Sequence, residues 1–117
     1  MADALHDPDK LKTRLINRRT GDSYTIYIGR KHGHRHYGNP FVIGVDGSRD
    51  EVVKKCDSWL KGIAYTEIEP VRRSWILRNL DQLEGEVLGC WCTPLPCHGD
   101  IYIQLLEERR RGICIKA

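Results

Sequence analysis

The stretch of sequence that decides the fold reads Glu86-Val87-Leu88-Gly89-Cys90-Trp91-Cys92-Thr93-Pro94-Leu95-Pro96-Cys97-His98-Gly99-Asp100. Residues 86–92 form a short and mostly apolar segment, which is typical of a buried strand. Two prolines make residues 93–96 a rigid connection. The residues after Asp100 predict a helix that ends at Arg109-Arg110-Arg111-Gly112. A strand that leads into a helix in this way is a building unit of α/β folds.

Two further helices are predicted before this stretch. Ser48-Arg49-Asp50-Glu51 places a hydroxyl and a carboxylate three residues apart, as in a capping box, and apolar residues follow at helical spacing. A helix is therefore expected from residue 49 to about 62, where Gly62 stops it. Pro70 fits the first turn of the next helix, which is expected to continue to about residue 84.

The first part of the chain has the character of strands and loops. Residues 11–19 alternate in polarity, Thr20-Gly21-Asp22 is a turn signal, and residues 24–28 are rich in β-branched and aromatic side chains. This pattern predicts two strands joined by a short turn. Residues 29–40 are a loop by composition, and Phe41-Val42-Ile43 predicts a further short strand or extended piece.

These elements predict an α/β protein with a small three- to four-stranded sheet and about three helices, as a Rossmann-like three-layer or two-layer sandwich. The 117 residues suit one domain, over residues 13–112, with a flexible lead-in at 1–12 and a C-terminal tail at 113–117. If the strands that end near Ile28 and Cys92 are parallel, the loops after them lie at one edge of the sheet. Ligands bind at that edge in such folds.

Composition narrows the class of protein. The net charge of +3 is mild for a dedicated binder of duplex DNA. No apolar run approaches the roughly 20 residues that a membrane helix needs, and the acidic start of the chain has no signal core, so a cytoplasmic protein without a membrane partner is expected. Five cysteines, three of them within eight residues, do not resemble a disulfide framework. They are expected to be free, metal-bound or catalytic.

The cysteine-rich stretch allows three interpretations. In the first, Cys97, His98 and Asp100 are catalytic, because a helix start lowers the pKa of a thiol and His98 can move a proton. In the second, Cys90, Cys92, Cys97 and His98 hold a zinc ion as a Cys₃His site. In the third, the two strand cysteines are small core residues and the other groups only start a helix.

A second cluster of polar residues lies in the loop over residues 29–40. Arg30 follows a predicted strand, from where its guanidinium can reach a phosphate or carboxylate. Asn39 either forms hydrogen bonds to a polar edge of a ligand or forms an Asx turn. Gly38 and Thr93 complete the predicted ligand-binding set. The alternating His32, His34 and His36 form either a metal tract or a solvated cationic loop.

The motifs resemble a phage and bacterial family catalogued as domain of unknown function 4326. The resemblance spans about residues 25–107, and Tyr37 stands where the family usually has tryptophan. It rests on residues 27–30, on Gly38-Asn39-Pro40-Phe41-Val42-Ile43-Gly44, on residues 46–49 and on residues 89–100. It implies an origin in phage, prophage or bacterial genomes, a compact α/β domain and an intracellular site. It implies no particular activity.

The leading hypothesis is a protein that binds a nucleotide-like or other phosphorylated ligand at the strand ends. Arg30 would hold the anionic group and Asn39 a polar edge, next to a helix start suited to anions. Whether the protein also processes its ligand, as an enzyme, is left open. A second hypothesis is a zinc-stabilised module that binds nucleic acid or protein. A third is a phage protein that blocks or sequesters a host component without chemistry.

Overall fold

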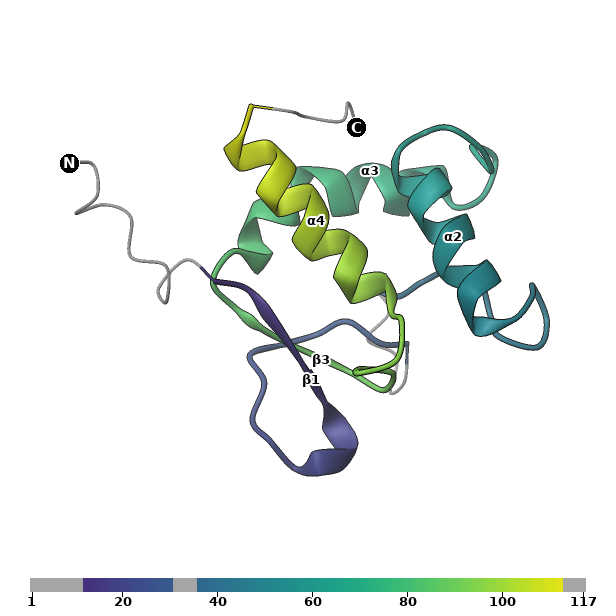
Figure 1. The fold of residues 1–117 in the computed structure, drawn as a ribbon. Helices are drawn as coiled ribbons and strands as arrows, with labels where there is room; N and C mark the ends of the chain where they lie inside the picture. Colours follow the sequence, from purple (N-terminus) through teal and green to yellow (C-terminus); the bar gives the residue numbers. More distant parts are fainter. Residues whose placement is uncertain (1–11, 31–35, 113–117) are drawn as a thin grey trace.

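The computed structural model of the chain describes residues 12–30 and 36–112. The predicted tail and the predicted lead-in, apart from Lys12, lie outside the described residues, as do His32 and His34. Figure 1 shows the strands at one end of the molecule and the helices gathered above them. The elements, in chain order, are β1 (Arg14–Asn17), the 3₁₀ turn η2 (Arg18–Thr20), β2 (Ile26–Tyr27), α2 (Arg49–Leu60), α3 (Pro70–Arg78), the 3₁₀ turn η4 (Leu80–Leu83), β3 (Val87–Cys90) and α4 (His98–Arg110).

The sheet has three parallel strands in the order β1-β3-β2, which confirms the predicted α/β class. Leu88 of the central strand lies opposite Leu15 of β1 and Ile26 of β2. The two strands predicted in the first part of the chain are present, but they do not pair with each other, because β3 lies between them. The buried, apolar β3 takes the centre, where it pairs on both edges. The strand predicted at residues 41–43 is reduced to one bridge, from Ile43 to Gly47.

The helices follow the local sequence signals closely. Ser48 Oγ accepts the Glu51 N–H, and the Glu51 carboxylate accepts the Ser48 N–H, so the predicted capping box is present at the start of α2. The second predicted helix is interrupted: α3 ends at Arg78, Asn79 leaves helical geometry, and η4 continues the chain to Leu83. Within the described residues, no helix is long and apolar enough to cross a membrane.

Loss of the α2 cap gives a first test of the fold. We expect Ser48→Ala to lower the free energy of unfolding by about 1 kcal/mol, because the Glu51 N–H loses its acceptor at the helix start. Ser58→Ala changes the same residue type inside the same helix, where no cap is lost, and is expected to be neutral or slightly stabilising. Urea denaturation of both variants makes the comparison, and equal losses would contradict the role of the cap.

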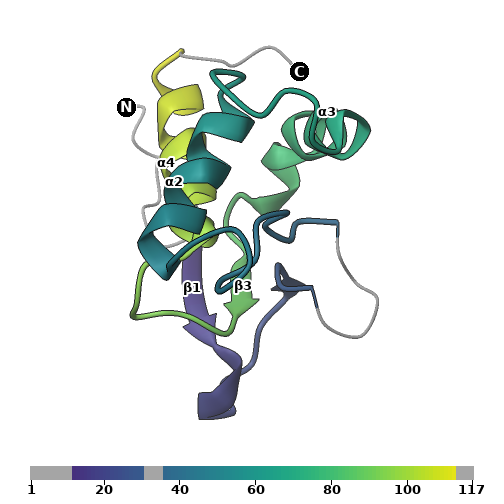
Figure 2. The ribbon, with the colours of Figure 1, turned by 90° about the vertical axis from the view of Figure 1, so that its right-hand side faces the viewer.

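Helix α4 packs closely against the sheet at its first turn. A Cβ added to Gly99 would come within 2.4 Å of the Leu15 side chain on β1 and 2.8 Å of Ile28 after β2. The glycine therefore lets the helix start approach both strands, and a larger residue here would force the Leu15 and Ile28 side chains to move. Figure 2 shows α2 and α4 beginning near the carboxyl ends of the strands and running away from them. Both helix starts thus lie at the edge where the sheet can bind ligands.

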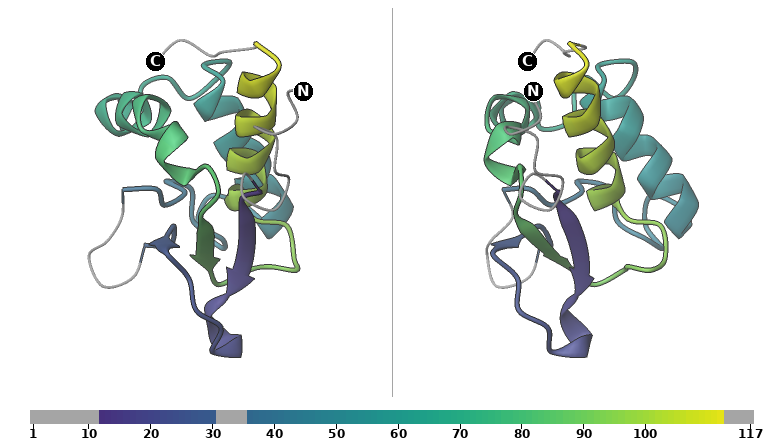
Figure 3. Two further views of the ribbon diagram at one scale, coloured as in Figure 1. Left: turned by 90° about the vertical axis from the view of Figure 1, so that its left-hand side faces the viewer. Right: turned by 60° about the vertical axis from the view of Figure 1, so that its left-hand side comes forward.

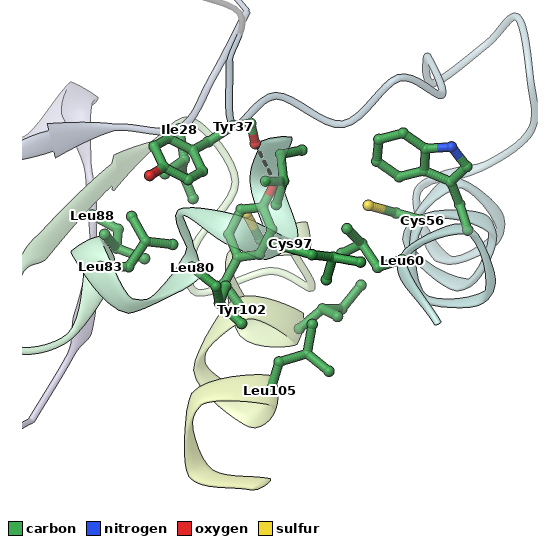
Figure 4. Close-up of a cluster of buried hydrophobic side chains, with 14 of the residues drawn as sticks. Ile28, Tyr37, Cys56, Leu60, Leu80, Leu83, Leu88, Cys97, Tyr102 and Leu105 are labelled. Atoms are coloured by element: carbon green, nitrogen blue, oxygen red, sulfur yellow. Dashed lines mark hydrogen bonds between the residues drawn. The ribbon is translucent and has the colours of Figure 1, made fainter. Parts of the chain in front are cut away.

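The core lies between the helices and the sheet (Figure 4). It contains fully buried leucines from α2, η4, β3 and α4 together with two tyrosines. The hydroxyl of the buried Tyr102 donates to the Tyr37 carbonyl at 2.5 Å, and the two rings meet edge to face. The Tyr37 hydroxyl donates to the Asn79 carbonyl at 3.0 Å. The two tyrosines therefore fix the loop before Asn39 to α4 and to the end of α3.

Aromatic residues gather around one arginine at the side of the strands. The Arg18 guanidinium lies 4.8, 5.2 and 5.1 Å from the ring centres of Tyr24, Tyr27 and Trp91. The Trp91 Nε1 donates to the Tyr27 hydroxyl at 3.0 Å. These contacts join the end of β1 to the chain after β3 and hold the strand ends in place. Figure 3 shows the turn η2 reaching past the end of the sheet.

Candidate functional site

A pocket of about 290 Å³ lies at the carboxyl ends of β2 and β3. Its wall includes Gly29 and Arg30 after β2, Cys92 and Pro96 after β3, and the first turns of α2 and α4. Because β2 and β3 are parallel, the two loops leave the sheet at the same edge. The predicted meeting of these loops is therefore confirmed.

The charge of the pocket wall comes from arginines. Arg19, Arg30 and Arg49 line it, and the described lining residues include no aspartate or glutamate. Arg49 is half-buried at the start of α2, and its Nη1 is buried without a hydrogen-bond partner in the described part of the chain. Sequence reasoning missed Arg19 and Arg49. The available signal was the helix start at Ser48, which places residue 49 where a parallel sheet binds ligands.

Three cysteines contribute to the pocket wall: Cys90 at the end of β3, Cys92 in the connection after it, and Cys97 at the start of α4. Cys97 is the N-cap of α4, and its sulfur accepts the Gly99 N–H at 3.4 Å. Cys97 is also close enough to Cys90 and Cys92 to shift the pKa values of both thiols. The Cys90 sulfur accepts the Thr93 N–H at 3.5 Å.

The hydrogen bonds divide the three thiols into one donor and two acceptors. The bond from Cys97 lowers the pKa of Cys90 to about 6 and that of Cys92 to about 6, and Arg49 also lowers the Cys92 value. The pKa of Cys97 is raised, chiefly by its bonds to the other two sulfurs and then by burial. The expectation of a lowered pKa at Cys97 is therefore wrong. The helix start does favour a thiolate there, but the neighbouring sulfurs outweigh it.

His98 is buried and fixed by backbone carbonyls. Its Nε2 lies 2.8 Å from the Ile28 oxygen and 3.0 Å from the Tyr37 oxygen, so Nε2 carries the proton and donates to both. Its Nδ1 lies 3.6 Å from the Cys97 sulfur. Burial lowers the pKa of His98 to about 4, which keeps the ring neutral at pH 7. His98 therefore closes the loop between residues 28 and 37, and it also lines the pocket.

The other predicted site residues have mainly structural contacts. The Asp100 carboxylate accepts the Cys97 N–H at 3.1 Å and completes a capping box. Asn39 forms the Asx turn, with Oδ1 accepting the Phe41 N–H and Nδ2 donating to the Val52 carbonyl, although it also lines the pocket. The carbonyl of Thr93 accepts from Asn17, and that of Gly38 accepts from Arg72; neither residue lines the pocket. Roles for these residues in binding or catalysis stay predictions.

The geometry does not gather the predicted zinc ligands. Among the residues that the structure describes, no three histidine, cysteine, aspartate or glutamate side chains are placed to hold a metal. His36, from the predicted histidine tract, is exposed and its ring centre lies 5.1 Å from that of Trp75.

The fold and pocket define a small α/β protein with a pocket at the ends of parallel strands, lined by arginines and cysteines. The chain belongs to the family described as Domain of unknown function (DUF4326), whose pattern matches residues 13–108, as the resemblance implied. It is 32% identical over 99 residues, 81% of this chain and 78% of the relative, to a protein of Enterobacteria phage T4 named "Uncharacterized 12.4 kDa protein in nrdA-td intergenic region". No solved structure matches significantly.

Proposed function

We propose that the protein binds a small anionic ligand, nucleotide-like or otherwise phosphorylated, in the pocket at the strand ends. The observation that carries the proposal is the buried Arg49 Nη1, which has no hydrogen-bond partner in the described part of the chain. The described residues of the pocket wall include two further arginines and no acidic residue. A buried donor without an acceptor costs about 1–3 kcal/mol. A phosphate oxygen would satisfy it with a charge-assisted bond.

The surrounding elements support an anion in this place. The first turns of α2 and α4 contribute to the wall, so two helix N-termini add positive potential. A thiolate on Cys92 offsets part of this charge, but Arg19 and Arg30 also face the pocket. The local potential therefore stays positive.

The remaining wall and the size of the pocket favour a small organic ligand. Phe41, Ile43, Val53 and Trp91 provide apolar surface for a sugar or base. The volume of about 290 Å³ is at the lower end of the range for ligand sites, roughly 300 to 1,000 Å³. The proposal concerns binding, because Cys97, His98 and Asp100 are engaged with the protein's own backbone.

Binding is tested with adenosine 5′-monophosphate, ribose 5-phosphate and inorganic phosphate, with adenosine as the uncharged control. We expect at least one of the three anions to raise the melting temperature, and adenosine to have little effect. Arg49→Gln is expected to weaken that anion about tenfold in calorimetric titration, because one charged donor is lost.

Arg78→Gln is the matched control for charge. Arg78 is an exposed arginine at the end of α3 and does not line the pocket, so its loss should leave the affinity unchanged. If none of the three anions binds, or if both arginine variants weaken binding equally, the proposed function is wrong.

A further inference from the structure

We propose that Cys92 and Cys97 form a dithiol site that a small hydroperoxide oxidises reversibly to a disulfide. The inference goes beyond the proposed anion binding and does not depend on it. It stands on two thiols that line the same pocket and come from different elements, one after β3 and one at the start of α4.

The two sulfurs have the arrangement that a reacting and a resolving thiol need. Cys92 is half-buried and lines the pocket, so a small peroxide can reach it. Cys97 is 1% exposed, lines the same pocket and lies close enough to Cys92 to be the main cause of its lowered pKa. A sulfenic acid formed on Cys92 would therefore meet a second thiol before a second peroxide molecule.

The environment of Cys92 assists the first step. Arg49 and Arg19 are positively charged, and both lie close enough to Cys92 to lower the pKa of its thiol. These charges favour the thiolate, which is the nucleophile in such reactions. They also stabilise the oxygen that leaves the peroxide as an anion.

The reaction balances with a hydroperoxide, ROOH, as the oxidant. The Cys92 thiolate attacks the terminal oxygen, the O–O bond breaks, and the leaving RO⁻ takes a proton to become ROH. The Cys97 sulfur then attacks the Cys92 sulfur, the S–O bond breaks, and hydroxide leaves with the Cys97 proton as water. Two thiols lose two electrons to the peroxide, and an added dithiol such as dithiothreitol reverses the oxidation.

The test uses the full chain carrying Cys114→Ser, so that the four cysteines that remain are all described. The reduced protein is treated with one equivalent of hydrogen peroxide near pH 7. We expect its four free thiols to fall to two, with return to four after dithiothreitol. An unchanged thiol count overturns the proposal.

Peptide mapping then identifies the pair. Cleavage after Trp91 separates Cys90 from Cys92, whereas Leu95-Pro96 resists chymotrypsin, so Cys92 and Cys97 stay in one peptide. A Cys92–Cys97 disulfide removes two hydrogens from that single peptide. A disulfide that includes Cys90 would instead join two peptides, and such a product as the main species overturns the assignment. This mapping needs no variant and is independent of anion binding.

Serine variants provide the matched comparison. Cys56→Ser is expected to leave formation of the disulfide intact, since Cys56 lies in the core on α2 and does not line the pocket. Cys92→Ser and Cys97→Ser should each reduce the product at least about tenfold, and Cys97→Ser should leave a sulfenic acid that dimedone traps. A disulfide of full yield in either of the last two variants would refute the proposed pair.

Discussion

His98→Ala is expected to lower the free energy of unfolding by about 2–4 kcal/mol, because the Ile28 and Tyr37 carbonyls lose a buried donor and the ring leaves a cavity. The two carbonyls lie on either side of the loop that His98 closes. Urea denaturation at pH 7 measures the loss. This result would assign His98 a structural role at the strand ends, in addition to any contact with a ligand.

Two controls separate the donor from the volume of the ring. Tyr102→Phe removes another donor to the Tyr37 carbonyl while His98 remains, so a smaller loss of about 1 kcal/mol is expected. His98→Gln keeps a side-chain donor and should fall between the wild type and His98→Ala. If His98→Ala is as stable as the wild type but loses anion binding, the structural role is wrong and His98 acts on the ligand instead.

The same residue predicts how stability depends on pH. Burial lowers the pKa of His98 in the folded protein to about 4, against 6.5 for an ordinary histidine. Above about pH 6.5 the ring is neutral in both states, and its contribution to stability is complete. As the pH falls from about 6.5 to about 4, only the unfolded chain takes up the proton, so stability falls by about 3 kcal/mol. The difference between the wild type and His98→Gln over this range isolates the effect from that of the carboxylates.

The sequence signals that correctly predicted the fold were local. Ser48 and Glu51 are three residues apart, so both residues of the α2 capping box lie within one helical turn and can be recognised from a short stretch of sequence. The order of the strands depends instead on contacts between distant segments, such as the Thr25 N–H and the Val87 carbonyl. No turn signal near Gly21 indicates that a strand more than sixty residues later will enter between β1 and β2. For the same reason, the break in the second helix at Asn79, whose carbonyl receives the Tyr37 hydroxyl, was not predictable from helical spacing.

The candidate site shows the same division between local and distant information. The motif at residues 90–98 predicted where the thiols lie, and the parallel strands bring Arg30 to the same pocket. The direction of the Cys97 pKa was wrong because the helix start is a local feature, whereas the bonds to the other sulfurs depend on the path of the connection after β3. Arg19 was missed because nothing in its neighbourhood in the sequence distinguishes it from other exposed arginines.

Alkylation of Cys92 is expected to slow about tenfold at pH 7 in Cys97→Ala, because loss of the hydrogen bond from Cys97 returns the pKa of Cys92 toward that of an ordinary thiol. In the wild type, the rate with iodoacetamide should rise with pH around a midpoint near 6, which is the pKa of Cys92. In Cys97→Ala the midpoint should move upward. Cleavage after Trp91 lets mass spectrometry follow Cys92 separately from Cys90.

Cys97→Ser and Arg49→Gln distinguish the two causes of the low Cys92 pKa. A serine hydroxyl can still donate to the Cys92 sulfur and cap α4, so Cys97→Ser should restore much of the wild-type rate and also exclude loss of the helix cap as the explanation. Arg49→Gln removes a positive charge but keeps the Cys97 thiol, and it should shift the midpoint upward by less than Cys97→Ala, since the bond from Cys97 is the larger effect. If Arg49→Gln moves the midpoint and Cys97→Ala does not, the charge on Arg49 rather than the thiol contact activates Cys92.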